Sequence, residues 1–503
     1  MKSIKLLHKN LVEIAQLKAI RNVLHWDQEI MMPKGAIQFR SQQMALVSKL
    51  IYEQFTGTNF KAALATHLDL DTGNCKDIQQ YSEQEVVILK TVYKDWKKAV
   101  CIPVSFATEL AELTSQSTHI WARARQENDF NQFKPYLEKL VEMQKQYAAY
   151  IDASKQPYDV LLDLYEPGLT AQKVSSVFDP LRDETVALLK RIQKSKKSFK
   201  TIQGTFDKQQ QWKFSLQLLN QLGYDFDKGR QDISTHPFTI DFHPSDVRIT
   251  TRINTNDPLE AITSTIHEAG HAFYEMGLDP KWFGTPLGEA CSLGVHESQS
   301  RFWENHIGLS SPFWKTQFEE LKRYFPEPLS NINALEFYEY ANQIKPGPIR
   351  VEADELTYNL HILIRFECEQ AIFNDNLDIK DLPALWNKKY KEYLGINIQS
   401  DAEGVLQDIH WAGGSFGYFP TYTLGTLYAA QINEKLELEF PDYHTLIQQL
   451  DFKSLKEWLT NHIHQFGRFY DPEKLMQQAT GQSLSIQPFV NYLHKKYQSI
   501  YSL

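Results

Sequence analysis

Apolar residues recur at three- and four-residue steps along most of this chain, with charged and polar residues between them. This period places the apolar side chains on one face of an α-helix. The clearest segments of this kind contain few helix-breaking residues and span residues 84–100, 135–154, 171–195, 208–222, 352–374 and 384–394. The sequence therefore predicts a mainly α-helical fold.

One region departs from the helical period. Residues 236–242 and 246–252 alternate polar with apolar side chains and are rich in β-branched and aromatic residues, which is typical of strands. Residues 243–245 would form the turn between them. The edge of a small sheet can pair with an extended peptide backbone. The alternative is a structural hairpin that makes no contact with a substrate.

A well-marked helix is expected directly after these strands. Asp257 can cap its first turn, Pro258 suits the first helical position, and Glu260 would complete a capping box. An apolar stripe follows, and Gly277 is a natural end of the helix. The stripe predicts that this helix is buried.

The motif H-E-x-x-H lies inside that helix, at His267, Glu268 and His271. Residues four apart share a helix face, so both imidazoles can reach one metal ion. Glu268 would lie beside this face, where a carboxylate can take a proton from a water molecule that zinc has acidified. The alternative is a chance match in a core helix, although two buried histidines would still need polar partners.

A catalytic zinc ion usually has three protein ligands, so one more is expected. Glu297 and His296 are the candidates, 26 and 25 residues after His271, where another helix is expected to begin. Neighbouring residues on a helix point about 100° apart, so only one of the two can bind. The pattern of H-E-x-x-H with a distant glutamate favours Glu297.

Two arginines are candidates for binding a free chain end. Arg350 follows a Pro-Gly-Pro break and Arg248 lies in the second predicted strand. A guanidinium can hold a carboxylate by two parallel hydrogen bonds. Either arginine could instead form a structural ion pair.

Residues 404–422 are rich in glycine and aromatic residues, which predicts a loop beside a site. His410 and a tyrosine from this loop could hydrogen-bond the oxyanion that forms when water attacks a carbonyl group. A packed aromatic loop without a catalytic role is the alternative.

Composition limits the partners. The 503 residues carry a net charge of −9, whereas a nucleic-acid surface calls for a basic excess, so no nucleic-acid partner is expected. The four cysteines lack C-x-x-C spacing, which predicts ordinary thiols.

Lysines interrupt residues 1–20, and no segment is apolar for long enough to span a membrane, so we expect no signal peptide, no membrane contact and a cytoplasmic location. No Gly/Ser-rich linker divides residues 1–503, which predicts a single domain, with two lobes around a cleft.

Several motifs, taken in order, resemble those of the carboxypeptidase Taq family of zinc metallopeptidases. They are Trp26-Asp27 with Met32-Pro33, residues 159–168, His236-Pro237-Phe238, D-x-R-x-T at Asp246, Arg248 and Thr250, H-E-x-x-H at 267–271, H-E-S-x at 296–299, I-R-x-x-A-D at 349–354, and G-x-x-Q-D-x-H-W at 404–411. The resemblance covers nearly the whole chain.

This resemblance implies a two-lobed helical body with a deep central cleft, similar to angiotensin-converting-enzyme-type and neurolysin-type peptidases. It implies a homodimer that removes single C-terminal residues, with broad specificity, from peptides that have a free C-terminus. His267, His271 and Glu297 would bind one Zn²⁺ per chain, with cobalt able to substitute, and Glu268 would be the general base and acid.

The resemblance also assigns the substrate contacts. Arg350 would anchor the terminal carboxylate. The remaining substrate-binding residues would be Arg248, His236, Asp246 and Gln407. His410 would contact the oxyanion together with Tyr418 or Tyr422, of which Tyr418 is favoured. The rival hypotheses are an oligopeptidase that cuts internally and a non-catalytic helical scaffold that retains a zinc site.

Overall fold

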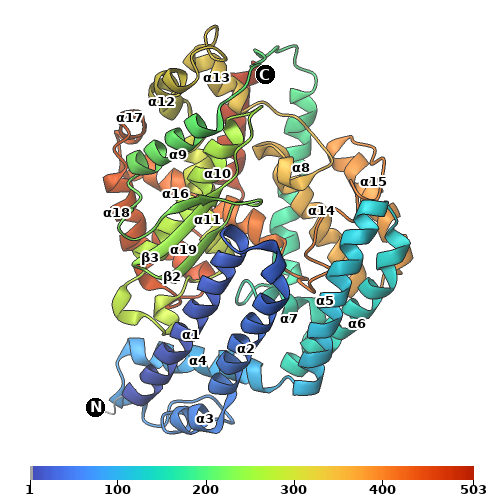
Figure 1. Cartoon of the computed structure of the whole chain (residues 1–503), viewed down its shortest axis with the longest axis vertical. Coiled ribbons are helices and arrows are strands. Elements are labelled where there is room, and N and C mark those ends of the chain that lie inside the picture. The colour runs from blue at the N-terminus through green and yellow to red at the C-terminus, as the bar shows by residue number, and fades with distance from the viewer. Residues whose placement is uncertain (1–3) are drawn as a thin grey trace.

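The computed structural model describes residues 4–503, and α-helices make up most of it (Figure 1). The helices before the sheet are α1 (Lys5–Ile30), α2 (Ile37–Thr56), α3 (Thr58–Ala65), α4 (Glu83–Val100), α5 (Val104–Glu127), α6 (Phe130–Asp152), α7 (Pro157–Asp163), α8 (Ala171–Ile192) and α9 (Lys208–Leu222). Those after it are α10 (Leu259–Gly277), α11 (Leu293–Arg301), α12 (Ser311–Tyr324), α13 (Ala334–Ala341), α14 (Glu355–Phe373), α15 (Leu382–Leu394), α16 (Pro420–Glu439), α17 (Tyr443–Gln449), α18 (Lys453–His462), α19 (Pro472–Thr480) and α20 (Gln487–Tyr501). The predicted mainly α fold is confirmed.

Helix boundaries follow from capping side chains. The predicted segment 208–222 coincides with α9. By contrast, α6 begins five residues before Pro135, because the Asp129 side chain caps it by accepting a hydrogen bond from the Asn131 N–H at 3.0 Å. Similarly, α14 begins three residues later than predicted, because Asp354 caps it through the Thr357 N–H at 2.9 Å.

The predicted strands form part of a small sheet with strand order β1-β3-β2. Its strands are β1 (Gln231–Ile233), β2 (Thr239–His243) and β3 (Asp246–Thr251). The predicted hairpin is present, because β2 pairs antiparallel with β3. The three-residue β1 was not predicted, since it is too short to show an alternating pattern; it runs parallel to β3. The order leaves β2 at an edge of the sheet.

The predicted capping box of α10 is wrong. The helix begins at Leu259, and Asp257 accepts a hydrogen bond from the Leu259 N–H at 2.9 Å. Glu260 does not turn back to the helix start; it forms an ion pair with Arg252, just after β3. A nearby guanidinium therefore competes successfully with the backbone for this carboxylate.

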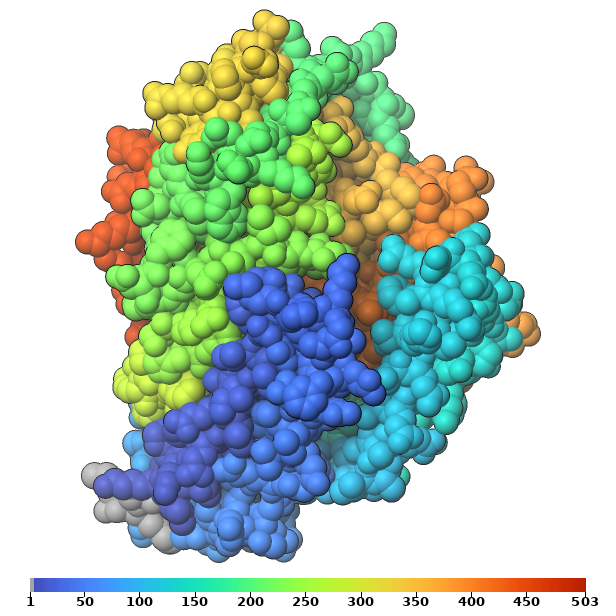
Figure 2. All heavy atoms as spheres, viewed as in Figure 1, coloured from blue at the N-terminus to red at the C-terminus, as the bar shows by residue number. Residues whose placement is uncertain are grey.

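Buried apolar residues form one large cluster through the middle and C-terminal parts of the described chain. A smaller cluster joins α1, α3 and α4. Figure 2 shows a hollow between the blue α1–α2 segment and the cyan α5–α6 segment, with orange atoms from the later part of the chain at its floor. The single domain with two lobes remains a prediction. Among residues 4–503, no helix is both long and apolar enough to cross a membrane.

Candidate active site

The predicted metal ligands converge. His267 and His271 lie on α10 and Glu297 lies on α11, and one donor atom from each lies within 4.8 Å of the others. The Glu297 Oε2 atom is 3.4 Å from His271 Nε2 and 3.7 Å from His267 Nε2. Tetrahedral zinc bonds of about 2.0–2.2 Å place ligand atoms roughly 3.3–3.6 Å apart. The three side chains therefore fit a zinc ion.

Two glycines allow the helices around Glu297 to approach each other. A Cβ atom on Gly270, within the H-E-x-x-H motif, would lie 2.6 Å from backbone atoms of Gln299 and Ser300 on α11. A Cβ atom on Gly425 of α16 would lie 2.5 Å from Glu297 Cγ. The close packing of α10 and α16 against α11 thus fixes the position of the Glu297 carboxylate.

His296, the competing candidate, does not belong to this group. Its Nε2 atom lies 2.7 Å from Glu275 Oε1. Its ring stacks on His271, with centroids 4.5 Å apart. His296 therefore supports the ring of His271 instead of replacing Glu297.

The electrostatics distinguish the two motif histidines. Burial lowers the pKa of His267, but Glu297 and Glu304 outweigh it and raise that pKa to about 9. Burial, reinforced by His296, lowers the pKa of His271 to about 3. For Glu297, burial is outweighed by Arg301 and His267, which hold its pKa well below the usual range. The carboxylates therefore make this point strongly attractive to a cation.

Glu268 lies beside the donor atoms and is buried. The Thr239 hydroxyl at the start of β2 lies 2.6 Å from Glu268 Oε2 and 3.0 Å from the Glu268 carbonyl oxygen. Burial raises the pKa of Glu268, which makes its carboxylate a stronger base. The edge strand and the motif helix are therefore joined at the residue predicted to move protons.

Arg350 is buried and already has an anionic partner. Its Nε and Nη2 atoms lie 2.9 and 2.8 Å from Asp408 Oδ1, and its Nη1 donates to the Tyr358 hydroxyl at 3.3 Å. Arg365 holds the other oxygen of Asp408 at 2.6 Å. Gln407 accepts a hydrogen bond from the Arg350 N–H at 2.9 Å, so it fixes the segment that carries this arginine.

The aromatic loop brings His410 and both candidate tyrosines together. The Tyr422 hydroxyl lies 3.5 Å from His410 Nε2. The ring of Tyr418 packs against His410, with centroids 5.3 Å apart. Burial, helped by Arg350, lowers the pKa of His410 to about 4, although Asp408 opposes this. This hydroxyl contact favours Tyr422 as the partner of His410, whereas the sequence had favoured Tyr418.

Asp246, Arg248 and His236 lie on or beside the sheet. Arg248 and Asp246 form a two-point ion pair at 2.8 Å, and the Arg248 guanidinium packs over the rings of Phe242 and Trp26. These contacts join β3 to α1. They support the structural alternative for Arg248, in which the arginine forms an ion pair within the protein instead of binding a free chain end. His236 is exposed just before β2.

The sequence missed several residues around the donor atoms. Glu304 Oε2 lies 2.8 Å from His267 Nδ1, and Arg301 Nε lies 2.7 Å from Glu297 Oε1. A signal was present, because positions 297, 301 and 304 follow the i, i+4, i+7 spacing of one helix face.

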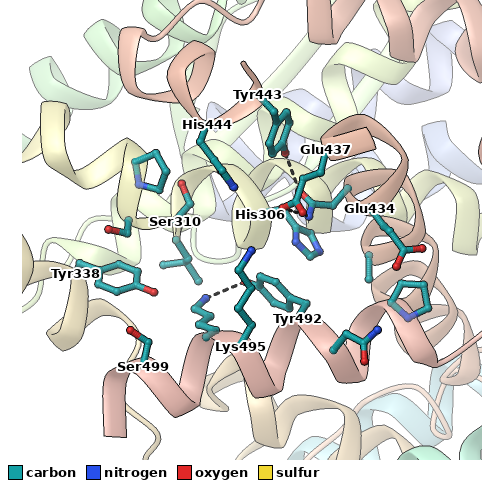
Figure 3. Close-up of a pocket in the computed structure, with 18 of the residues that line it drawn as sticks. His306, Ser310, Tyr338, Glu434, Glu437, Tyr443, His444, Tyr492, Lys495 and Ser499 are labelled. Atoms are coloured by element: carbon teal, nitrogen blue, oxygen red, sulfur yellow. Dashed lines mark hydrogen bonds between the residues drawn. The ribbon is translucent and has the colours of Figure 1, made fainter. Parts of the chain in front are cut away.

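Glu304 belongs to the π-helix Phe302–Gly308, and His306 of the same helix lines a cavity of about 540 Å³. Figure 3 shows His306 and Tyr492 close together there, with ring centroids 4.3 Å apart. None of the predicted site residues lines this cavity. It is therefore separate from the candidate active site.

A mainly helical body in which two motif histidines, a distant glutamate and a buried second glutamate meet has the architecture of a metallohydrolase. Residues 6–497 match the family described as carboxypeptidase Taq (M32) metallopeptidase. The chain belongs to this family and is a metallocarboxypeptidase.

Similar proteins cover nearly its whole length. Carboxypeptidase 1 of Bacillus subtilis is 40% identical over 483 residues, which are 96% of this chain and 95% of that protein. Thermostable carboxypeptidase 1 of Thermus thermophilus is 38% identical over 500 residues, 97% of each chain. The crystal structure of the M32 carboxypeptidase from Deinococcus radiodurans is similar with a TM-score of 0.94, at 36% identity and 99% coverage of both chains. The similarity to angiotensin-converting-enzyme-type and neurolysin-type peptidases remains a prediction.

Proposed function

We propose that this metallocarboxypeptidase is zinc-dependent and removes single residues from the free C-terminus of peptides with broad specificity. The observation that carries the proposal is the group formed by His267, His271 and Glu297, with Glu268 beside it. Two imidazoles and one carboxylate are a usual protein ligand set of catalytic zinc. When bound, zinc supplies a Lewis acid that makes water nucleophilic near neutral pH.

Glu268 takes the proton from the attacking water and then returns it to the leaving amine. Its burial supports this role, because the raised pKa brings the carboxyl closer to the pH at which it must both accept and release a proton. The Thr239 hydroxyl holds the carboxylate in place.

His410 and Tyr422 stabilise the negative charge that develops on the scissile carbonyl oxygen. The lowered pKa of His410 supports a neutral imidazole at pH 7, and its contact with the Tyr422 hydroxyl places two hydrogen-bonding groups side by side. Tyr418 packs against both rings and keeps them in position.

Arg350 receives the terminal carboxylate of the substrate. A guanidinium offers five N–H donors, more than its contacts with Asp408 and Tyr358 use. Asp408 and Gln407 hold the arginine rigidly, which reduces the entropy lost on binding. The edge strand β2, linked to Glu268 through Thr239, lies where the extended substrate backbone can pair. His236, just before β2, would contact the same substrate, whereas the contacts of Asp246 and Arg248 with each other and with α1 support the structural alternative for this pair.

The substitution Glu268→Gln tests this function. It keeps the size of the side chain but removes its basicity, so kcat should fall about 10²–10⁴-fold while one Zn²⁺ per chain remains bound. Metal content and the rate of C-terminal residue release are measured on the same preparations. Near-normal turnover by a zinc-loaded variant would exclude Glu268 as the general base.

We also propose that cobalt substitutes for zinc and that the protein is a homodimer in the cytoplasm. Dimerisation follows from the family resemblance, and the location is an expectation from the sequence. Light scattering checks the dimer, and a mass of one 58.5 kDa chain would contradict it.

A further inference from the structure

Arg301 connects two side chains at the proposed metal site. Its Nε atom lies 2.7 Å from Glu297 Oε1, whereas Glu297 Oε2 is the oxygen that faces the two histidines. Its Nη1 atom lies 3.3 Å from Glu304 Oε2, and this carboxylate holds His267 Nδ1 at 2.8 Å. A single guanidinium therefore contacts the glutamate ligand directly and a histidine ligand through one carboxylate.

The place of Arg301 is itself fixed by packing. Its side chain is 14% exposed, and its guanidinium lies 4.3 Å from the centre of the Tyr358 ring. Stacking on an aromatic face holds the plane of a guanidinium and directs its N–H groups sideways. Tyr358 in turn accepts a hydrogen bond from Arg350.

The charges support the same role. Glu268, Glu297 and Glu304 place three carboxylates close together, and Arg301 forms ion pairs with two of them. One guanidinium and one divalent cation together balance three negative charges. Without the guanidinium, the buried site would keep an uncompensated negative charge even when a dication is bound.

We propose that Arg301 is a positioning residue that makes Glu297 bind the metal through one oxygen and keeps His267 oriented through Glu304. By occupying Oε1, the guanidinium prevents the carboxylate from binding through both oxygens. It thus leaves room on the metal for water and substrate, which a catalytic site requires. This inference rests on the proposed zinc site.

The test compares Arg301→Met and Arg301→Lys with the wild-type protein. We expect Arg301→Met to weaken zinc binding about 10–100-fold, measured by competition with a chromogenic chelator. Its Co²⁺ form should have a different visible absorption spectrum, because the freed carboxylate changes the coordination number. Arg301→Lys keeps the charge, but one ammonium cannot reproduce the fork that reaches both carboxylates. Its spectrum should therefore also differ from that of the wild type.

Glu304→Gln is a third variant, which keeps the shape of the side chain but removes the charge that holds His267. Like Arg301→Met, it should bind zinc more weakly than the wild type. Arg323→Met on α12 is the matched control, because among the described residues this exposed arginine forms an ion pair with Glu320 of the same helix and with no residue of the metal site. It should bind zinc like the wild type. Circular dichroism of the metal-free proteins checks that each variant folds.

Three outcomes separate the hypotheses. Wild-type zinc affinity and an unchanged Co²⁺ spectrum in Arg301→Met would overturn the positioning role. A wild-type spectrum and affinity in Arg301→Lys would show that charge alone suffices and would overturn the role of the fork. If the wild-type chain itself bound no zinc, the proposed function would be overturned, and this inference, which rests on it, would be overturned with it.

Discussion

Gly425 of α16 is a position where adding a single methyl group should disturb the metal site. In Gly425→Ala, the new Cβ would lie 2.5 Å from Cγ and 2.6 Å from Cβ of Glu297, and 3.1 Å from its backbone carbonyl carbon. Ordinary contact begins at 3.4 Å, so α11 and α16 must separate by about 0.9 Å. A rotamer change of Glu297 cannot remove the clash, because Cβ and a backbone atom are both involved.

The expected magnitudes follow from this displacement. Overpacking a buried contact costs about 1–3 kcal/mol of unfolding free energy. A shift of about 1 Å at a catalytic group can lower activity about 100-fold. Gly425→Ala should therefore bind zinc more weakly and lose about 100-fold in kcat/KM, even though no ligand has been replaced.

The assay measures zinc affinity by chelator competition, kcat/KM for release of a C-terminal residue, and urea unfolding of the metal-free protein. Gly35→Ala is the control, because a Cβ there would meet no atom within 4 Å. It should stay within about 0.5 kcal/mol of the wild type. Wild-type zinc affinity and activity in Gly425→Ala would refute the reasoning.

Three further predictions concern other parts of the site. Arg350→Ala should lower kcat/KM for peptides with a free C-terminus roughly 30- to 160-fold, which corresponds to a loss of about 2–3 kcal/mol of binding energy, and should affect amidated peptides less. An equal loss of kcat/KM on both kinds of peptide would show that this arginine is structural. Tyr422→Phe should reduce kcat more than Tyr418→Phe, by up to about 100-fold, since its hydroxyl contacts His410, and steady-state kinetics showing the reverse order would reject that choice. Glu369 of α14 is buried under the aromatic loop, where it accepts hydrogen bonds from Trp411 Nε1 and the Gly417 N–H. Burial raises the pKa of Glu369 to about 7, so the folded chain keeps a proton that the unfolded chain releases above about pH 4.5. The unfolding free energy should therefore fall by up to about 3 kcal/mol between pH 4.5 and 7. Urea titrations at several pH values should show that the unfolding free energy of Glu369→Gln lacks this part of the pH dependence; a variant with the same pH dependence as the wild type would contradict the prediction.

The features that depend on local spacing could be predicted from the sequence. The four-residue step between His267 and His271 placed two donors on one face of a predicted helix. The limits of α9 agree with the predicted segment 208–222, which has a helical period and few helix-breaking residues. The choice of Glu297 over His296 also agrees with the geometry, since the donor atoms of His267, His271 and Glu297 converge.

The remaining features depend on contacts between distant segments. Thr239 meets Glu268, and Asp408 meets Arg350, only because the fold brings separate elements together. No local pattern encodes such a pairing. The capping box failed for the same reason, since Arg252 attracts the carboxylate of Glu260. The i, i+4, i+7 spacing of Glu297, Arg301 and Glu304 could be read from the sequence, but its role became clear only once the positions of the two histidines were known.

The most direct test of the central claim is time-resolved mass spectrometry of one unblocked peptide and its C-terminally amidated twin, with and without a zinc chelator. The account predicts stepwise loss of single residues from the free C-terminus alone, and loss of that activity in the chelator. Internal cleavage of both peptides, or cleavage that continues in the chelator, would contradict it.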